Sequence, residues 1–280
     1  MIKENKLLID KHCPMCQIYG QAFIKTGLLD QDSICAYQDV PMESQMKIDF
    51  ERAQDEIAMH DTRTGTTTYG LASILKIITQ SSPVLNKILH HALVYKVLNV
   101  LYKFISYNRK VIAPAAPPQG TARLCEPSFN IPFRWAYILF VAIVTAFIVN
   151  AFTANLFPHF GWTHSIKTEL LICFGQVAWQ GTVAYFLLEE NRLTYLGNMS
   201  TVSMIGAILL LPILFILSMV KAPLLVLLGM FFTVIGIMFL EHIRRCKLLG
   251  ISLWTTVSWV TFRTVALGIL ILIKEIQMVW

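Results

Sequence analysis

The sequence predicts an α/β domain at the N-terminus followed by an all-α domain of five transmembrane helices, with four as the alternative. Three observations lead to this division. Hydrophobic residues make up 55% of the 280 residues and charged residues only 14%, whereas a soluble domain carries about 25% charged residues. Residues 1–134 hold 15 of the 23 Lys and Arg residues and 12 of the 17 Asp and Glu residues. Long apolar segments follow residue 134.

The composition also limits the classes of function. So high an apolar content excludes a disordered chain and an ordinary cytosolic enzyme. The isoelectric point is near 9.0, but the Lys and Arg residues form no dense run, and positive loops are expected of membrane proteins in any case. We therefore expect no nucleic-acid partner.

Apolar spacing and turn residues predict the order β-α-β-α-β-β-α with trailing helices in the first domain. Short apolar runs indicate strands at Lys6–Ile9, Ser33–Tyr37, Asp55–His60 and Thr66–Tyr69. The last two flank Asp61-Thr62-Arg63-Thr64-Gly65, which predicts a hairpin turn. Helical spacing, with Gly27 and Pro83 as end signals, indicates helices at Gln17–Thr26, Glu43–Ala53 and Gly70–Gln80, one that starts at Pro83, and one at Ala92–Lys110.

The Pro-rich stretch Ala113–Gly120 is the natural linker. We therefore expect a first domain at 1–112, a linker and juxtamembrane segment at 113–134, and a membrane domain at 135–280. The apolar segments of the membrane domain each approach or exceed the ~20 residues that cross a bilayer as a helix. They are Trp135–Leu156, Leu170–Leu188, Met199–Val220, Pro223–Leu240 and Ile251–Ile273. Only Lys221 and Ala222 separate the third from the fourth, so a re-entrant segment and four spans are the alternative.

Two features predict the orientation in the membrane. No apolar run long enough for a secretory signal opens the chain. With the first domain in the cytosol, the inside loops and ends carry eight Lys and Arg residues and the outside ones carry three, as the positive-inside rule requires. We expect an integral protein of the inner or plasma membrane, with a cytoplasmic N-terminal domain and the C-terminus outside.

The strongest chemical signal is Cys13-Pro14-Met15-Cys16, which follows a predicted strand and opens a predicted helix. A helix N-terminus favours a thiolate, because its backbone N–H groups and macrodipole stabilise negative charge. Lys11 and His12 add positive potential, and Pro14 fits the first helical turn. We expect Cys13 to be the more exposed thiol and the attacking one, and Cys16, one turn further on, to resolve the mixed disulfide.

A lone CxxC pair also occurs as half of a metal site. Here no second CxxC or nearby His/Cys cluster completes four ligands, and His12 cannot complete a tetrahedral site alone. Cys35 on the second strand is either a third ligand or a small core residue. The strand–CxxC–helix context favours a redox pair, so we predict no metal and no resident cofactor.

The segment Asp10-Lys11-His12-Cys13-Pro14-Met15-Cys16 resembles the DxxCxxC signature of the DCC family of thiol-disulfide oxidoreductases. Tyr69-Gly70-Leu71-Ala72 and the closing Tyr102–Arg109 segment also resemble family features, so the resemblance covers about residues 5–112. It implies a thioredoxin-like fold with the cysteine pair at its active site. Thioredoxin-like enzymes usually place a cis-proline before the third strand. No proline lies between residues 41 and 83 here, and we expect Thr66–Thr68 in that region.

Three further residues have two interpretations each. Asp10 either accepts a proton from the cysteine pair or ends the strand and caps the following turn. Arg109 either holds an anionic substrate or lipid headgroup or is a membrane-proximal positive residue. Arg263 lies near the middle of the last span, where a charge is costly. It marks a polar site for a quinone or lipid, or it holds helices together, with Glu241, Glu169, Gln176 and Gln180 as candidate partners.

Together these patterns predict a membrane-anchored thiol-disulfide oxidoreductase, acting on a protein or small-molecule disulfide or thiol, in contact with membrane lipid. A quinone at Arg263 would make it a thiol:quinone oxidoreductase. The competing hypothesis is a membrane transport, lipid-binding or assembly protein whose cytosolic domain senses redox state or binds a metal. The sequence predicts neither the substrate nor the oligomeric state.

Overall fold

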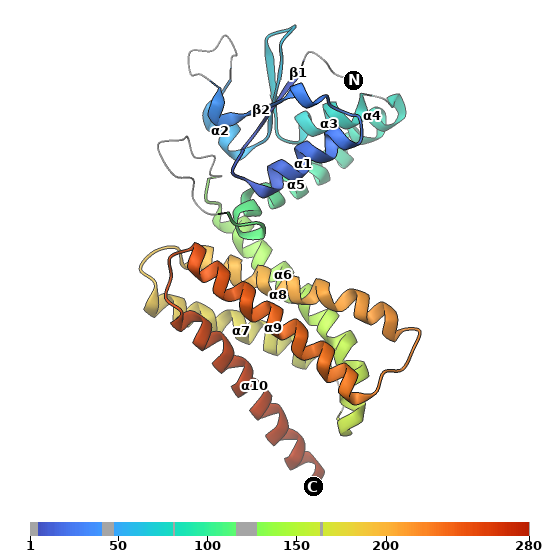
Figure 1. Ribbon diagram of the computed structural model, residues 1–280, viewed down its shortest axis with the longest axis vertical. Helices are drawn as coiled ribbons and strands as arrows, with labels where there is room; N and C mark the ends of the chain where they lie inside the picture. The colour runs from blue at the N-terminus through green and yellow to red at the C-terminus, as the bar shows by residue number, and fades with distance from the viewer. Residues whose placement is uncertain (1–4, 41–47, 81, 116–127, 163–164, 280) are drawn as a thin grey trace. The chain divides into compact units, whose positions relative to one another are not determined.

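The computed structural model describes residues 5–40, 48–80, 82–115, 128–162 and 165–279. The chain forms two compact units, Met1–Arg134 and Trp135–Trp280. The first contains a small mixed sheet with helices, and the second is helical (Figure 1).

The first unit has the predicted order β-α-β-α-β-β-α followed by two more helices. Its strands are β1 (Asn5–Ile9), β2 (Ile34–Ala36), β3 (Ala58–Asp61) and β4 (Thr66–Tyr69). Its helices are α1 (Pro14–Lys25), α2 (Phe50–Asp55), α3 (Leu71–Thr79), α4 (Pro83–Leu89) and α5 (Ala92–Ile112), with 3-10 turns η1 (Gln31–Ser33) and η2 (Tyr37–Asp39). Part of the predicted helix Glu43–Ala53 and most of the predicted linker lie outside the described residues.

The sheet has the strand order β2-β1-β3-β4. β1 is parallel to β2, with Leu8 opposite Cys35, and antiparallel to β3. β3 and β4 form the predicted hairpin, and the Asp61 carboxylate accepts the turn N–H groups of Arg63 and Thr64 at 3.0 and 3.1 Å. These bonds hold the pKa of Asp61 below its ordinary value, with the Thr64 bond as the largest cause.

The side chains of β1 alternate between two cores, as the period of two in a strand requires. Leu7 is fully buried in one core, together with Leu29, Met59 and Ile77. Its neighbour Leu8 belongs to the other core, together with Tyr37, Val40, Ala53 and Ala58. Because both faces of the central strand are covered, the position at which β1 ends, and with it the cysteine pair, is fixed.

The juxtamembrane residues are bonded to the first unit. Ser128 Oγ donates to Asp55 Oδ2 at 2.8 Å. Asn108 Nδ2 on α5 donates to the carbonyl of Phe133 at 3.1 Å, and the Tyr107 and Phe133 rings stack with centroids 5.3 Å apart. Phe133 belongs to the first turn of α6 (Ile131–Leu156).

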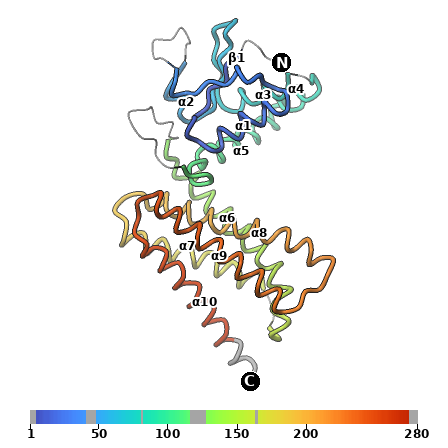
Figure 2. Tube along the Cα trace, in the orientation of Figure 1, coloured from blue at the N-terminus to red at the C-terminus, as the bar shows by residue number. Residues whose placement is uncertain are grey.

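The second unit contains five helices, each long and apolar enough to cross a membrane. They are α6, which is followed by the 3-10 turn η3 (Phe157–Phe160), α7 (Ile166–Leu187), α8 (Arg192–Leu217), α9 (Leu224–Leu248) and α10 (Trp254–Val279). α8 and α9 are separate full-length helices that pack against each other, so five candidate spans replace the alternative of four (Figure 2).

All five helices extend past one end of the predicted apolar segments, and α8 and α9 extend furthest. α8 begins at Arg192 instead of Met199, and α9 continues to Leu248 instead of Leu240. The added turns carry polar residues, and some of these, such as Asn198, His242 and Arg245, are buried in the structure. Arg245 on α9 donates to Asn198 Oδ1 on α8 at 2.9 Å and to Glu241 at 2.7 Å. A hydropathy pattern does not predict that such turns belong to the helices, because it registers the charged residues but not the groups with which they pair.

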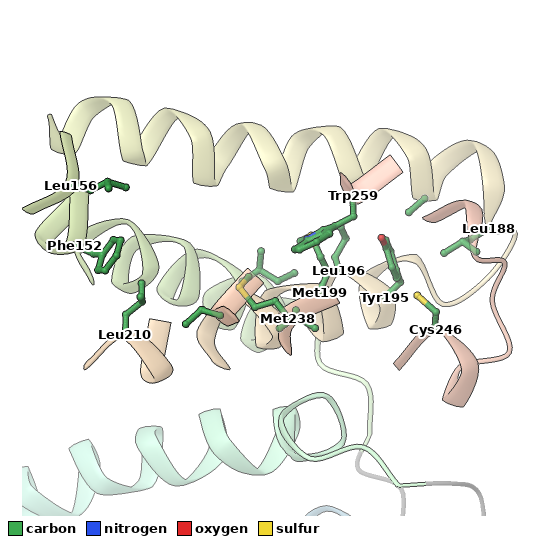
Figure 3. Packing of buried hydrophobic residues seen from close by; sticks show 14 of the residues in the cluster. Phe152, Leu156, Leu188, Tyr195, Leu196, Met199, Leu210, Met238, Cys246 and Trp259 are labelled. Carbon is green, nitrogen blue, oxygen red and sulfur yellow. The ribbon is translucent and has the colours of Figure 1, made fainter. Parts of the chain in front are cut away.

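An apolar cluster of described residues from this helical unit forms its core. Figure 3 shows Phe152 and Leu156 toward one end of the cluster and Tyr195 and Cys246 toward the other. Gly206 on α8 permits the close approach of α9. A Cβ atom at Gly206 would lie 2.2 Å from Sδ and 3.0 Å from Cγ of Met238.

Candidate active site

The cysteine pair lies at the N-terminus of α1, directly after the loop that follows β1. Cys13 is the N-cap residue, in an extended conformation (φ −94°, ψ 113°), and Pro14 occupies the first helical turn as predicted. No disulfide joins the two cysteines in this structure. The predicted order of exposure is wrong, because Cys13 is 0% exposed whereas Cys16 is partly exposed. The turn closed by the hydrogen bond from Cys13 N to Asp10 O directs the Cys13 side chain inward.

The two thiols differ strongly in acidity. The pKa of Cys13 falls from an ordinary 9.0 to about 6, mainly because the Cys16 thiol donates a hydrogen bond to its sulfur, and the Arg109 charge lowers it further. Burial and Asp10 oppose this shift. The same hydrogen bond, together with burial, raises the pKa of Cys16. Near neutral pH, Cys13 is therefore the thiolate and Cys16 the thiol.

Tyr19 also belongs to the site, although we did not predict it. Its pKa is raised first by burial and then by the charges of Cys16 and Cys13, so its hydroxyl senses the charge of the cysteine pair. The sequence carries a signal for this position, since Tyr19 lies three residues after Cys16 on one helix and shares its face.

Asp10 is 2% exposed and is held from two sides. Its Oδ1 accepts the backbone N–H of His12 at 2.9 Å and the side-chain amide of Gln38 at 2.7 Å. Lys110 Nζ lies 3.6 Å from the second oxygen, Oδ2. Asp10 thus ends the strand and caps the turn, as one interpretation required. Its role as a proton acceptor stays a prediction.

Gln38, in η2 at the end of β2, is a site residue that the sequence did not reveal. Its Nε2 donates to Asp10, and its Oε1 accepts the backbone N–H of Lys11 at 3.2 Å. The Lys11 side chain instead pairs with Asp39 at 2.5 Å, and both groups are exposed. Lys11 and His12 therefore contribute backbone donors to this loop, while Arg109 supplies the positive charge that lowers the Cys13 pKa.

The C-terminal half of α5 holds the chain between α2 and β3. Tyr102 Oη accepts the backbone N–H of Ile57 at 2.9 Å, and Ser106 donates to the carbonyl of Asp55. Arg109 is buried and donates to the carbonyls of Asp55 and Gln54. These bonds explain why β3 starts at Ala58 and not at the predicted Asp55.

One interpretation required Arg109 to face an anionic substrate or lipid headgroup. In this structure Arg109 is buried and does not face one. Its guanidinium lies inside the unit and is bonded to backbone carbonyls, so it acts on the thiols through its charge. The region before the third strand also needs a correction. Thr66–Thr68 lies in β4, and the residue directly before β3 is Ile57. Among the described residues no peptide bond is cis.

The Tyr69–Ala72 and Tyr102–Arg109 segments, which also resemble family features, both bind the backbone of Ile57. Gly70 N donates to the carbonyl of Ile57 at 2.7 Å, and the hydroxyl of Tyr102 accepts the N–H of Ile57. Gly70 has φ +66°, and a Cβ there would lie 2.8 Å from Glu56 Oε2 and 3.3 Å from the Tyr102 ring. A side chain at this position would thus be strained and crowded at once.

Metal binding has little geometric basis in the described part of the chain. No group of three or more His, Cys, Asp or Glu side chains there is arranged to hold a metal ion. The Cys35 side chain packs against the core that contains Leu8 and Tyr37.

Arg263 lies in the second unit, where its Nε donates to Gln176 Oε1 at 2.9 Å and its guanidinium lies 5.3 Å from the centre of the Trp259 ring. Of its other predicted partners, Glu241 pairs with Arg244 and Arg245 instead. A cavity of about 20 Å³ adjoins Arg263, Gln176 and Thr145. Small-molecule pockets measure roughly 300–1,000 Å³, so this particular cavity is too small for a quinone ring.

A second buried polar cluster connects α7, α8, α9 and α10. Tyr195 Oη donates to Gln180 Oε1 at 2.7 Å and lies 3.4 Å from Nε2 of His242. The Nδ1 atom of His242 lies 2.9 Å from Thr256 Oγ1 and 3.4 Å from Cys246 Sγ. This network joins neighbouring helices through hydrogen bonds, as polar residues in membrane spans commonly do.

Comparison with protein-family models, curated proteins and solved structures found no match for this chain. The function is therefore inferred from the site itself.

Proposed function

We propose that the first unit is a thiol-disulfide oxidoreductase with a thioredoxin-like fold, similar to the DCC family, and that the second unit anchors it in a membrane. The observation that carries the proposal is the position of Cys13 as the N-cap of α1, one turn before the Cys16 thiol that lowers its pKa. A thiol with a pKa of about 6 at a helix N-terminus is mostly a thiolate at neutral pH and can attack a disulfide. A second thiol, one turn along and hydrogen-bonded to the first, can then resolve the mixed disulfide.

The exchange takes two steps. The Cys13 thiolate attacks one sulfur of a substrate disulfide, the substrate S–S bond breaks, and the leaving sulfur takes a proton from solvent. Cys16 loses its proton and attacks Cys13 Sγ, the bond between Cys13 and the second substrate sulfur breaks, that sulfur takes up a proton, and a Cys13–Cys16 disulfide remains. The substrate has gained two electrons and the dithiol has lost them. Run backwards, the same steps oxidise a substrate dithiol.

The exposures of the two cysteines define how a substrate reaches the site. Cys16 is partly exposed and Cys13 is fully covered. A substrate disulfide therefore meets the Cys16 side of the pair first and needs a local opening of the first turn of α1 to reach Cys13. The rate at which Cys13 reacts is then proportional to the fraction of Cys13 that is a thiolate and to the fraction of molecules in which the first turn of α1 is open.

The surroundings of β3 bear on the class of substrate. Both backbone polar groups of Ile57, the residue before β3, are bonded within the unit, to Tyr102 and Gly70. An extended peptide could not pair with this residue as an added strand would. We therefore favour a substrate that presents its disulfide without strand pairing, such as a small disulfide or a protruding protein loop.

Trapping the mixed disulfide tests the proposal. In the full-length protein, Cys16→Ser should accumulate a substrate adduct on Cys13, Cys13→Ser should abolish turnover, and the control Cys35→Ser should leave turnover unchanged. An adduct on Cys16 in the Cys13→Ser variant would reverse the assignment of the nucleophile. Full disulfide-reduction activity in both active-site variants would refute the enzyme hypothesis and favour a sensing or structural role.

A further inference from the structure

The helix pair α4–α5 presents an apolar face on the outside of the first unit. Soluble proteins rarely expose a contiguous apolar patch of this kind without a partner. Val84 on α4 is 68% exposed, and Leu93 on α5 is 67% exposed. The other exposed apolar residues of the face are Leu85, Ile88, Val97, Val100, Leu101 and Ile105.

α5 is amphipathic with its polar stripe turned inward. Leu93, Val97, Leu101 and Ile105 are four residues apart and form one exposed stripe. The stripe of Tyr102, Ser106 and Arg109 is instead committed to the chain between α2 and β3. The exposed apolar stripe therefore does not belong to the core of the first unit, because the opposite, polar face of α5 makes the hydrogen bonds to that unit.

The charge around this face has a single sign. No Asp or Glu occurs between Asp61 and Glu126. Lys87 and Lys96 are exposed beside the apolar residues. Lys96 and Lys103 are seven residues apart, which places them along one flank of the apolar stripe. A helix with an apolar face flanked by lysines is typical of segments that lie in a membrane interface.

The end of α5 is bonded to the start of a candidate span. Asn108 donates to the carbonyl of Phe133, and the Tyr107 ring stacks on the Phe133 ring. Phe133 lies in the first turn of α6, which is long and apolar enough to cross a membrane. α5 is thus fastened to the point at which the chain would enter the bilayer.

From these contacts and charges we infer that the α4–α5 face lies on an anionic lipid surface. The apolar stripe enters the boundary between headgroups and acyl chains, and Lys87, Lys96 and Lys103 contact lipid phosphates. A second copy of the chain fits the face less well, because a symmetric dimer apposes the same patch of both copies. That arrangement would bring lysines against lysines with no carboxylate between residues 62 and 125 to pair with them.

A lipid-quenching measurement tests this inference. The full-length protein is placed in nanodiscs of phosphatidylcholine, or of phosphatidylcholine mixed with phosphatidylglycerol, each with brominated acyl chains. An environment-sensitive fluorophore is attached through an azido amino acid in place of Val97 or, as the control, of Thr64 in the exposed β3–β4 turn. We expect strong quenching at position 97 in the anionic mixture, weaker quenching in phosphatidylcholine alone, and little at position 64 in either.

Charge reversal at Lys87 and Lys96 provides a second measurement. Both side chains are exposed, so their replacement should not disturb the fold. Each lysine reversed near an anionic surface should weaken docking about fivefold or more, so K87E/K96E should remove most of the quenching at position 97. The control Lys25→Glu, at the exposed end of α1, makes the same kind of change elsewhere and should leave it intact. Quenching at position 97 no stronger than at 64, or equal in the two lipids, would overturn the inference. A shielded but unquenched label in a cross-linked dimer would assign the face to a second copy.

Discussion

Gln38 donates a 2.7 Å hydrogen bond from its side-chain amide to the buried carboxylate of Asp10, which is 28 residues away in sequence. The same side chain accepts the backbone N–H of Lys11. One amide therefore ties the end of β2 to the loop that carries the cysteine pair, and it fixes the carboxylate that precedes Cys13. In the proposed enzyme Gln38 is a positioning residue, acting through Asp10.

Gln38→Ala should slow disulfide turnover by about 10- to 100-fold, because a hydrogen bond to a charged group contributes about 1.5–3 kcal/mol. The affected step is the one that depends on Asp10, so the pH profile of turnover should shift as well. The measurement is turnover against pH in the full-length protein. Gln80→Ala is the matched control, since Gln80 donates to the carbonyl of Leu28, away from Asp10. An unchanged pH profile in Gln38→Ala would contradict the positioning role.

The acidity of Cys13 predicts its behaviour with pH. The thiol is protonated below a pKa of about 6 and is a thiolate above it, so the thiolate signal should rise through pH 6 and be complete near neutrality. A free cysteine would still be mostly protonated there. The ultraviolet absorbance of the thiolate, taken as the difference between the parent and Cys13→Ser, measures this midpoint. Alkylation should follow the same midpoint but proceed slowly, because Cys13 is covered. A midpoint near 8.5 would remove the main support for the enzyme hypothesis.

The two charges nearest Cys13 should move its pKa in opposite directions. Arg109→Met removes a positive charge and should raise the pKa of Cys13, whereas Asp10→Asn removes a negative charge and should lower it further. Arg109→Lys separates charge from geometry, because lysine keeps the charge but cannot reproduce the bonds to both Gln54 and Asp55. We expect Arg109→Lys to leave the midpoint close to that of the parent. Equal shifts in the Met and Lys variants would show that the packing of α5, and not the charge, sets the acidity.

Loss of Arg109 should also loosen the chain before β3. A buried carbonyl left without its donor costs about 1–3 kcal/mol. Arg109→Lys keeps the charge but cannot reach both carbonyls, so it should lose part of this stability as well. Proteolysis of the first unit in the full-length protein reports this opening, with cleavage expected near residues 54–57. Ser128→Ala, which removes a bond to the Asp55 side chain from an exposed residue, is the milder comparison.

Local patterns in the sequence carried most of the fold. The strand that ends at Ile9, the turn around Asp61 and the helix from Pro83 each have a signal within a few residues, and each occurs where it was predicted. The start of β3, the start of α8 and the end of α9 have no such local signal and differ from the prediction. Their boundaries depend on Arg109 and Arg245, whose partners lie 54 and 47 residues away in sequence.

The site divides in the same way. Cys13, Cys16 and Asp10 form one short motif and lie together, as expected. Gln38 could not be predicted, because nothing near it in sequence signals that η2 will fold against the loop after β1. The exposure of Cys13 was inferred wrongly for a related reason. An N-cap residue is usually open to solvent, and only the packed structure shows that the Asp10–Cys13 turn faces inward.

The contact between Gly206 and Met238 offers a test of the second unit that is independent of the cysteine chemistry. In Gly206→Ala, the new Cβ would meet Met238 Sδ at 2.2 Å and Cγ at 3.0 Å, so α8 and α9 must separate slightly or Met238 must change rotamer. Overpacking of this kind costs about 1–3 kcal/mol. The double variant G206A/M238A removes the clashing atoms and should recover part of that loss, whereas Gly229→Ala on α9, where nothing lies within 4 Å, should be tolerated. Unfolding of the full-length protein in detergent measures the effect, while disulfide turnover by the first unit should stay unchanged. If Gly206→Ala were as stable as Gly229→Ala, the close packing of α8 on α9 would not be a source of stability in this bundle.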